Sequence, residues 1–189
     1  GIRALIFILL LNILTACGKS AAEKWQEQYD LGQQYLLEEN YEGAIVAFTE
    51  AIEIDPNQAD AYIGRGNAYI LSGETEEHLA QALADYQQVL ALDETNAQAY
   101  LGIADVYIRQ GKYDAAIEIL NEGKEKTGSN EKIMEKIAEE WQEQYNLGQQ
   151  YLLEKDYEGA ILAFTRAIEI DLNQTDAYIG RGNAYILSG

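Results

Sequence analysis

Few side chains in this sequence have the types and spacing that catalysis or metal binding requires. His78 is the only histidine; it lies beside Glu76 and Glu77, but no second histidine accompanies it to complete a zinc site. The acids and amides of residues 55–60 lack the glycine and the terminal glutamate of a calcium-binding loop. Nucleophile-elbow, zinc-protease and phosphate-loop motifs do not occur in the sequence. We therefore expect no catalytic residues, no metal and no cofactor, and a protein that is not an enzyme.

The N-terminus has the organisation of a secretory signal peptide. Arg3 is the only charge before Lys19, an apolar run occupies residues 4–14, and small residues follow. This run is shorter than the roughly 20 residues that a membrane-spanning helix needs. Residues 14–17, with the sequence LTAC, resemble the lipobox of bacterial lipoproteins. The resemblance implies cleavage before Cys17, acylation of Cys17, and a protein held by that lipid in the bacterial cell envelope, on the extracytoplasmic side of a membrane.

The composition is strongly acidic. The sequence has 32 Asp and Glu against 13 Lys and Arg, a formal net charge of −19. Such a surface repels phosphate backbones, so we expect no nucleic-acid partner. It also repels anionic headgroups, so we expect contact with the membrane only through the lipid on Cys17. Two interpretations of the acidity stay open, which are solubility and the attraction of basic partners.

A long internal duplication is the main feature of the rest of the chain. Residues 25–73 and 141–189 are identical except at seven positions. The differing pairs are Asp30/Asn146, Glu39/Lys155, Asn40/Asp156, Val46/Leu162, Glu50/Arg166, Pro56/Leu172 and Ala59/Thr175. Arrays of repeats tolerate such duplications, because each unit contacts only its neighbours.

Each copy also contains a shorter period of about 34 residues. The characteristic side chains of the first period are Leu31, Gly32, Tyr35, Tyr41, Ala44, Phe48, Ala51 and Pro56. This pattern resembles the tetratricopeptide repeat, in which each unit is a pair of antiparallel helices. The resemblance implies an all-α fold, an α-solenoid that forms a right-handed superhelix. The organisation we expect is a signal peptide at 1–16, lipidated Cys17 and a short tether at 17–24, repeats at 25–58, 59–96 and 97–130, a helical spacer at 131–140, and a fourth repeat with a truncated fifth at 141–189.

Helical periodicity supports this interpretation independently of the family. Within residues 41–55, the apolar side chains recur at helical spacing and form one stripe. The second repeat is four residues longer than the others, around residues 74–81, so we expect its second helix to be longer. The spacing of Ile133, Met134 and Ile137 predicts one long helix from about 131 to 154. We expect this helix to divide the array into two blocks, residues 19–130 and 131 onward.

The family resemblance also implies a peptide-binding groove, which the first helices of the repeats line. Its positions are the second, fifth, ninth and twelfth of each unit. In this sequence they are Gln26, Tyr29, Gln33, Leu36, Asp60, Ile63, Asn67, Ile70, Gln98, Leu101, Asp105, Ile108, Gln142, Tyr145, Gln149 and Leu152. This set mixes amide, acidic and apolar side chains and has no Lys or Arg. We therefore expect the groove to bind a neutral-to-basic segment of a partner protein.

The function we expect from these features is that of a non-enzymatic, lipid-anchored scaffold. Two alternatives stay open: the array is the recognition arm of a longer envelope enzyme whose catalytic domain lies beyond residue 189, or it is a spacer without a ligand. The last helix has repeat-like apolar side chains, among them Tyr178 and Ile186, although no second helix follows it in the sequence. We expect such an exposed face to favour self-association.

Overall fold

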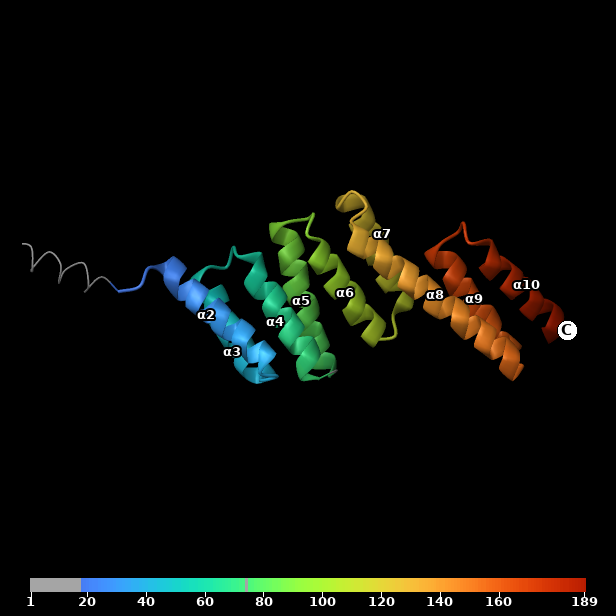
Figure 1. Ribbon diagram of the computed structural model, residues 1–189, viewed down its shortest axis with the longest axis horizontal. Helices are drawn as coiled ribbons and strands as arrows, with labels where there is room; N and C mark the ends of the chain where they lie inside the picture. Colours follow the sequence, from blue (N-terminus) through green and yellow to red (C-terminus); the bar gives the residue numbers. More distant parts are fainter. Residues whose placement is uncertain (1–17, 74) are drawn as a thin grey trace, which may run out of the picture. The chain divides into compact units, whose positions relative to one another are not determined.

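Helices joined by short turns make up the described part of the chain. The computed structural model describes residues 18–73 and 75–189, and the helices in these residues confirm the predicted all-α fold. The chain divides into two compact units, called here unit 1 (residues 1–73) and unit 2 (residues 74–189). The helices of unit 1 are α2 (Ala21–Leu37), α3 (Tyr41–Ile54) and α4 (Ala59–Ser72) (Figure 1). Those of unit 2 are α5 (Glu76–Leu92), α6 (Ala97–Arg109), α7 (Tyr113–Lys126), α8 (Glu131–Glu154), α9 (Tyr157–Ile170) and α10 (Thr175–Ser188).

The expected signal peptide at 1–16 and the lipidation site Cys17 lie outside the described residues. Among the helices of residues 18–73 and 75–189, none is both long enough and apolar enough to cross a membrane.

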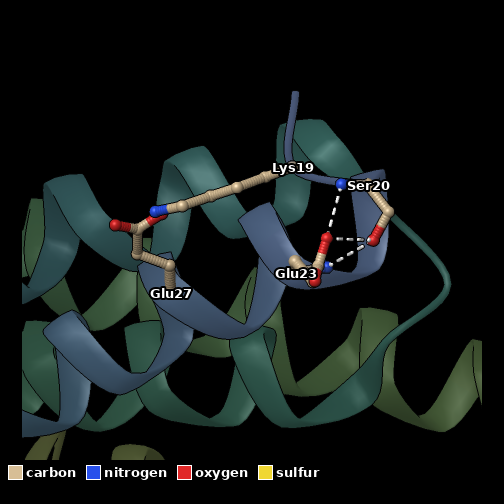
Figure 2. A network of polar contacts seen from close by, with 4 residues as sticks. All are labelled: Lys19, Ser20, Glu23 and Glu27. Carbon is tan, nitrogen blue, oxygen red and sulfur yellow. Dashed lines mark hydrogen bonds and ion pairs between the residues drawn. The ribbon is translucent and has the colours of Figure 1, made fainter. Parts of the chain in front are cut away.

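A capping box starts α2 at its N-terminal end. The Ser20 hydroxyl accepts a hydrogen bond from the Glu23 backbone N–H at 3.2 Å, and the Glu23 carboxylate accepts one from the Ser20 backbone N–H at 2.7 Å (Figure 2). These two bonds satisfy backbone donors that the first turn leaves unpaired. An ion pair between Lys19 and Glu27 lies beside the cap (Figure 2). The sequence predicts a tether up to residue 24, but residues 21–24 form the first turn of α2.

Unit 1 is built around one phenylalanine. Phe48 of α3 is fully buried, and its ring lies against Gly32 of α2 and Gly64 of α4. A Cβ atom added at Gly32 would come within 2.7 Å of this ring, and one added at Gly64 within 2.5 Å. These glycines therefore permit α2 and α4 to approach the same side chain, which fixes the spacing between two first helices of consecutive repeats.

Unit 2 repeats this arrangement and extends it. Phe164 of α9 is fully buried, and it lies against Gly148 of α8 and Gly180 of α10, where an added Cβ would come within 2.7 and 2.6 Å of its ring. A larger cluster, which includes Tyr100, Leu120, Ile133 and Ile170, joins α6, α7, α8 and α9. This cluster is the core of unit 2.

Two of the predicted helix lengths are confirmed. The long helix expected from about 131 to 154 is α8, Glu131–Glu154. The longer second helix of the second repeat is α5, which has 17 residues where the corresponding helices α3 and α9 have 14.

The boundary between the two compact units lies elsewhere in the chain than the division expected at residue 131, because unit 1 ends at Gly73. The apolar side chains Ile133 and Ile137 of α8 are buried in the same cluster as Leu120 of α7. Helix α8 therefore shares its core with the helix that precedes it. The boundary falls instead inside the second predicted repeat, next to Gly73, whose positive φ of 146° suits a residue without a side chain.

Candidate functional site

The first helices of the repeats lie next to each other within each unit, as a groove requires. In unit 1, α2 contacts α4, and in unit 2, α8 contacts both α6 and α10. The second helices, which include α3 and α9, supply the buried phenylalanines that space them. The packing therefore places the sequence-predicted groove positions of each unit on adjacent helices.

An aromatic and amide arrangement occupies the groove positions of α2. The rings of Trp25 and Tyr29 are stacked, with their centroids 5.0 Å apart and an interplanar angle of 10°. The centroid of the Tyr29 ring lies 5.8 Å from that of the Phe48 ring. Gln33 Nε2 donates a hydrogen bond to the Tyr29 hydroxyl at 3.1 Å. Burial raises the pKa of the Tyr29 phenol, and the nearby Asp60 carboxylate of α4 raises it further. Tyr29 and Asp60 are thus neighbours across the two helices.

The same arrangement recurs on α8. Trp141 stacks on Tyr145 at 5.1 Å with an interplanar angle of 11°, and Gln149 Nε2 donates to the Tyr145 hydroxyl at 3.0 Å. The indole N–H of Trp141, like that of Trp25, is buried and has no acceptor among the residues that the structure describes. Each copy therefore holds a buried, unsatisfied indole N–H next to its stacked tyrosine.

Charge on the predicted groove of unit 2 is largely paired. Arg109 Nε of α6 lies 3.0 Å from Asp105 Oδ2, one turn away on the same helix. This pair neutralises the arginine closest to the predicted groove positions of α6.

Most of the predicted groove residues reach the surface. The exposed or half-buried ones are Gln26, Tyr29, Gln33, Leu36, Asp60, Asn67, Gln98, Leu101, Asp105, Ile108, Gln142, Tyr145, Gln149 and Leu152. Ile63 and Ile70 of α4 are each only 8% exposed, so they offer little area to a ligand. The assignment of the whole set to peptide binding stays a prediction.

Sequence reasoning missed a pocket of about 390 Å³ between α7, α8 and α9. It lies away from the predicted groove: at about 100° per residue, its α8 residues Glu140 and Gln144 are roughly 140° around the helix from the groove positions. Its apolar lining comes from Tyr113, Ala116, Ile117 and Ile170. Its polar lining comes from Asp114, Glu118, Asn121, Glu140, Gln144, Arg166 and Glu169.

Two polar residues of the pocket lining are buried. Glu140 is 3% exposed and Gln144 is 2% exposed. Lys136 Nζ lies 2.8 Å from Glu140 Oε1, whereas Gln144 Oε1 has no hydrogen-bond donor among the described residues. The guanidinium of Arg166 lies over the Tyr113 ring, 5.2 Å from its centre. The sequence carries a partial signal: the fourth residue of a repeat is tyrosine at Tyr62, Tyr100 and Tyr178 and glutamine at Gln28 and Gln144.

Metal ligands do not gather in the part of the chain that the structure describes. No group of three or more His, Cys, Asp and Glu side chains in that part has the arrangement to hold a metal ion. His78 lies at the start of α5, where its backbone N–H donates to the Thr75 hydroxyl that caps the helix.

Within each unit, consecutive helices pack on one another, and a glycine of each neighbouring first helix lies against the same buried phenylalanine, which is the arrangement of a helical-repeat protein. Comparison with protein families gives the class: a TPR repeat model matches residues 32–73, and tetratricopeptide repeat models match residues 75–133 and 144–174. The chain is a tetratricopeptide repeat protein. It is also similar to tetratricopeptide repeat protein 16 of Mus musculus, with 36% identity over 53 residues. That match covers 28% of this chain and only 7% of the length of the mouse protein.

Solved structures with the same architecture support the fold. A crystal structure of MamA protein superposes with a TM-score of 0.54 at 23% identity and covers 89% of this chain and 84% of its own. The TPR2B domain of yeast Sti1, in a complex with pHsp70, gives a TM-score of 0.50 at 26% identity, covering 55% of this chain and 79% of its own.

Proposed function

We propose that this chain is a non-enzymatic scaffold that binds a segment of a partner protein along the first helices of its repeats. The observation that carries the proposal is the stacked Trp–Tyr pair with its supporting glutamine, which both copies preserve on α2 and α8. Tyrosine and tryptophan supply large contact areas at little entropic cost and are frequent in binding hot spots. The similarity to the Sti1 domain, whose structure contains pHsp70, supports the same class of function.

The unused indole donors suggest how a peptide backbone is held. Trp25 Nε1 and Trp141 Nε1 are buried donors without acceptors among the described residues, and a buried N–H that finds no partner is costly. We infer that the indole rings shift on binding, so that a carbonyl group of the bound segment becomes the missing acceptor. The exposed Asp60 carboxylate then favours a segment that is neutral or basic.

A displayed library of random peptides tests this proposal with residues 18–189 as bait. The expected ligands carry a net charge of zero or above. Their affinity falls about fivefold when Trp25→Phe and Trp141→Phe are combined, because each change removes one hydrogen-bond donor and keeps the aromatic shape. Selection of mostly acidic ligands contradicts the charge argument.

A matched pair of charge variants locates the binding surface. Asp60→Lys with Asp105→Lys reverses two charges on the predicted groove. Glu53→Lys with Glu122→Lys makes the same change on exposed positions of α3 and α7. Weaker binding of a basic peptide by the first variant alone supports the groove, and equal weakening by both excludes it.

We further propose that a lipid on Cys17 anchors the scaffold to a membrane on the extracytoplasmic side of a bacterial cell. The LTAC sequence after an apolar run supports this location, and two or more acyl chains are what stable anchoring requires. Mass spectrometry of the protein from bacterial membranes tests it. The expected result is an N-terminal acylated cysteine, and Cys17→Ser releases the protein from the membrane fraction. An unmodified Cys17 that follows uncleaved residues 1–16 contradicts the proposal.

A further inference from the structure

Helix α10 leaves exposed an apolar face that the same sequence buries in α4. We call this surface the α10 face; its residues are Tyr178, Ile179, Gly182, Tyr185 and Ile186. Tyr178 is 41% exposed and Ile186 is 79% exposed, whereas the equivalent residues Tyr62 and Ile70 are each 8% exposed. The two helices differ only in their first residue. The α10 face therefore has a sequence that this protein buries elsewhere, and no helix of residues 18–73 and 75–189 covers it in α10.

The position of Gly182 suits the α10 face to close contact with another helix. At about 100° per residue, the five residues of the face lie within an arc of roughly 120°, and Gly182 is at its centre. A Cβ atom added at Gly182 would have no atom within 4 Å. Ala177 and Ala184, on the other side of the helix, are fully buried in clusters with side chains of α9. An apolar stripe of this width is what an amphipathic helix packs against a neighbour.

The order of side chains along the α10 face is symmetric. Tyr178 and Ile179 precede Gly182 by four and three residues, and Tyr185 and Ile186 follow it by three and four. In an antiparallel pair of such helices with a two-fold axis at Gly182, Tyr178 lies opposite Ile186, and Ile179 lies opposite Tyr185. A two-fold interface requires a surface of this kind, which is complementary to itself. The missing side chain of the glycine lets the two backbones approach.

Charge favours a second copy of this helix over a basic partner. The chain has a formal net charge of −19, so two copies repel each other over most of their surface. Helix α10 carries only one acid, Asp176, and one base, Arg181, and has no net charge. The Arg181 guanidinium is held by its own chain, because it lies 5.7 Å from the centre of the Tyr178 ring and donates a hydrogen bond to Thr165 Oγ1. A neutral apolar face matches another neutral apolar face and offers nothing to a cation.

We propose that α10 pairs with α10 of a second copy of the chain, antiparallel about a two-fold axis at Gly182. One face of one helix is small beside the roughly 800 Å² that each partner buries in a stable interface. The dimer therefore forms only at high protein concentration, and α10 stays exposed in dilute solution.

Sedimentation velocity of the full chain, from micromolar to millimolar concentration, tests the pairing. The expected result is a shift from monomer to dimer, which Ile179→Glu with Ile186→Glu weakens at least tenfold by placing carboxylates within the contact. Leu153→Glu with Leu172→Glu adds the same charge at residues that are 85% and 68% exposed outside the α10 face, and this control dimerises like the unmodified chain. A chain that stays monomeric overturns the proposal, as does association that persists in the first variant or is lost equally in both.

Cysteine cross-linking tests the position of the two-fold axis in a Cys17→Ser background, which removes the only native cysteine. Gly182→Cys lies on the axis, so oxidised glutathione is expected to link the two copies through a disulfide. Thr175→Cys lies seven residues away, which separates its two copies by about 21 Å along antiparallel helices, far beyond the roughly 7 Å between Cα atoms that a disulfide spans. Thr175→Cys therefore stays unlinked. A disulfide at Thr175→Cys, or none at Gly182→Cys, overturns the antiparallel arrangement.

Discussion

Helices α2 and α8 have nearly the same sequence from Trp25 and Trp141 onward, yet the same residue is buried in one and half-buried in the other. Gln28 of α2 is half-buried, whereas Gln144 of α8 is 2% exposed. The reason is that α8 has α7 packed against it within unit 2, and no helix precedes α2 in the described residues. A half-buried glutamine in one copy thus corresponds to a buried glutamine that lines a pocket in the other.

In contrast, contacts inside the duplicated segment are the same in both copies. Arg65 Nη1 donates to Thr49 Oγ1 at 3.0 Å, and Arg181 Nη1 donates to Thr165 Oγ1 at 3.3 Å. The contacts within the duplicated segment are therefore the same at both places in the chain. The burial of its outer side chains depends on which helix packs against them.

The largest expected effect tests whether the internal packing of the two copies is equivalent. Phe48→Ala and Phe164→Ala each remove a fully buried ring between two glycine-bearing helices, and each lowers the free energy of unfolding by about 3–5 kcal/mol. Urea unfolding followed by circular dichroism measures this change. Val46→Ala and Leu162→Ala, at exposed positions, are the controls and change it little. Costs that differ by more than about 2 kcal/mol between the phenylalanine variants contradict equivalence.

The next effect tests the difference between α4 and α10, whose sequences differ at one position. Ile70 is 8% exposed and Ile186 is 79% exposed. Ile70→Ala therefore lowers the free energy of unfolding by about 2–3 kcal/mol, whereas Ile186→Ala changes it by less than about 0.5 kcal/mol. Thermal unfolding of the two variants side by side gives the answer. A similar loss of unfolding free energy in both variants means that α10 is covered in solution. Sedimentation velocity then shows whether the cover is a second copy of the chain.

A smaller effect concerns the buried carboxylate of α8. Lys136 is the ion-pair partner of Glu140, whose side chain is 4% exposed. Lys136→Met leaves this charge unpaired and lowers the free energy of unfolding by about 1–2 kcal/mol, less than for a fully buried pair because Lys136 is partly exposed. Lys24→Met, at the α2 position equivalent to Glu140, has almost no effect. Adding Glu140→Leu to Lys136→Met is expected to restore the lost free energy of unfolding. A further decrease in the double variant means that the Glu140 carboxylate makes another stabilising contact.

The smallest effect is expected to be the same in both copies. Hydrogen bonds from the Gln58 side chain and the Asn57 backbone N–H lower the pKa of Asp55, and the Asn173 backbone N–H does the same for Asp171. These carboxylates contribute stability above the ordinary carboxyl pKa, and the contribution is lost as pH falls through the lowered folded-state pKa values. Carboxyl-detected NMR titration should show both pKa values below about 3.9, the usual value of aspartate. An ordinary value for either contradicts the turn geometry of that copy.

Predictions from local patterns were the successful ones. The helix within residues 41–55, the lengthening of α5 and the extent of α8 are properties of short sequence windows. A hydrophobic stripe, a capping side chain or a four-residue insertion acts within a few turns of helix. The groove positions come from the family pattern, and the structure places most of them at the surface without testing their ligand.

The sequence by itself determined the all-α fold, the lengthening of α5 and the extent of α8, because each of these depends on hydrophobic periodicity and helix length within a short stretch of the chain. Only the tertiary structure decided that the chain divides next to Gly73, that Ile63 and Ile70 are buried, and that Gln144 faces a pocket. Burial is a property of the neighbour as much as of the residue, and identical segments here have different neighbours. That is the physical reason why a duplicated sequence does not produce two identical sites.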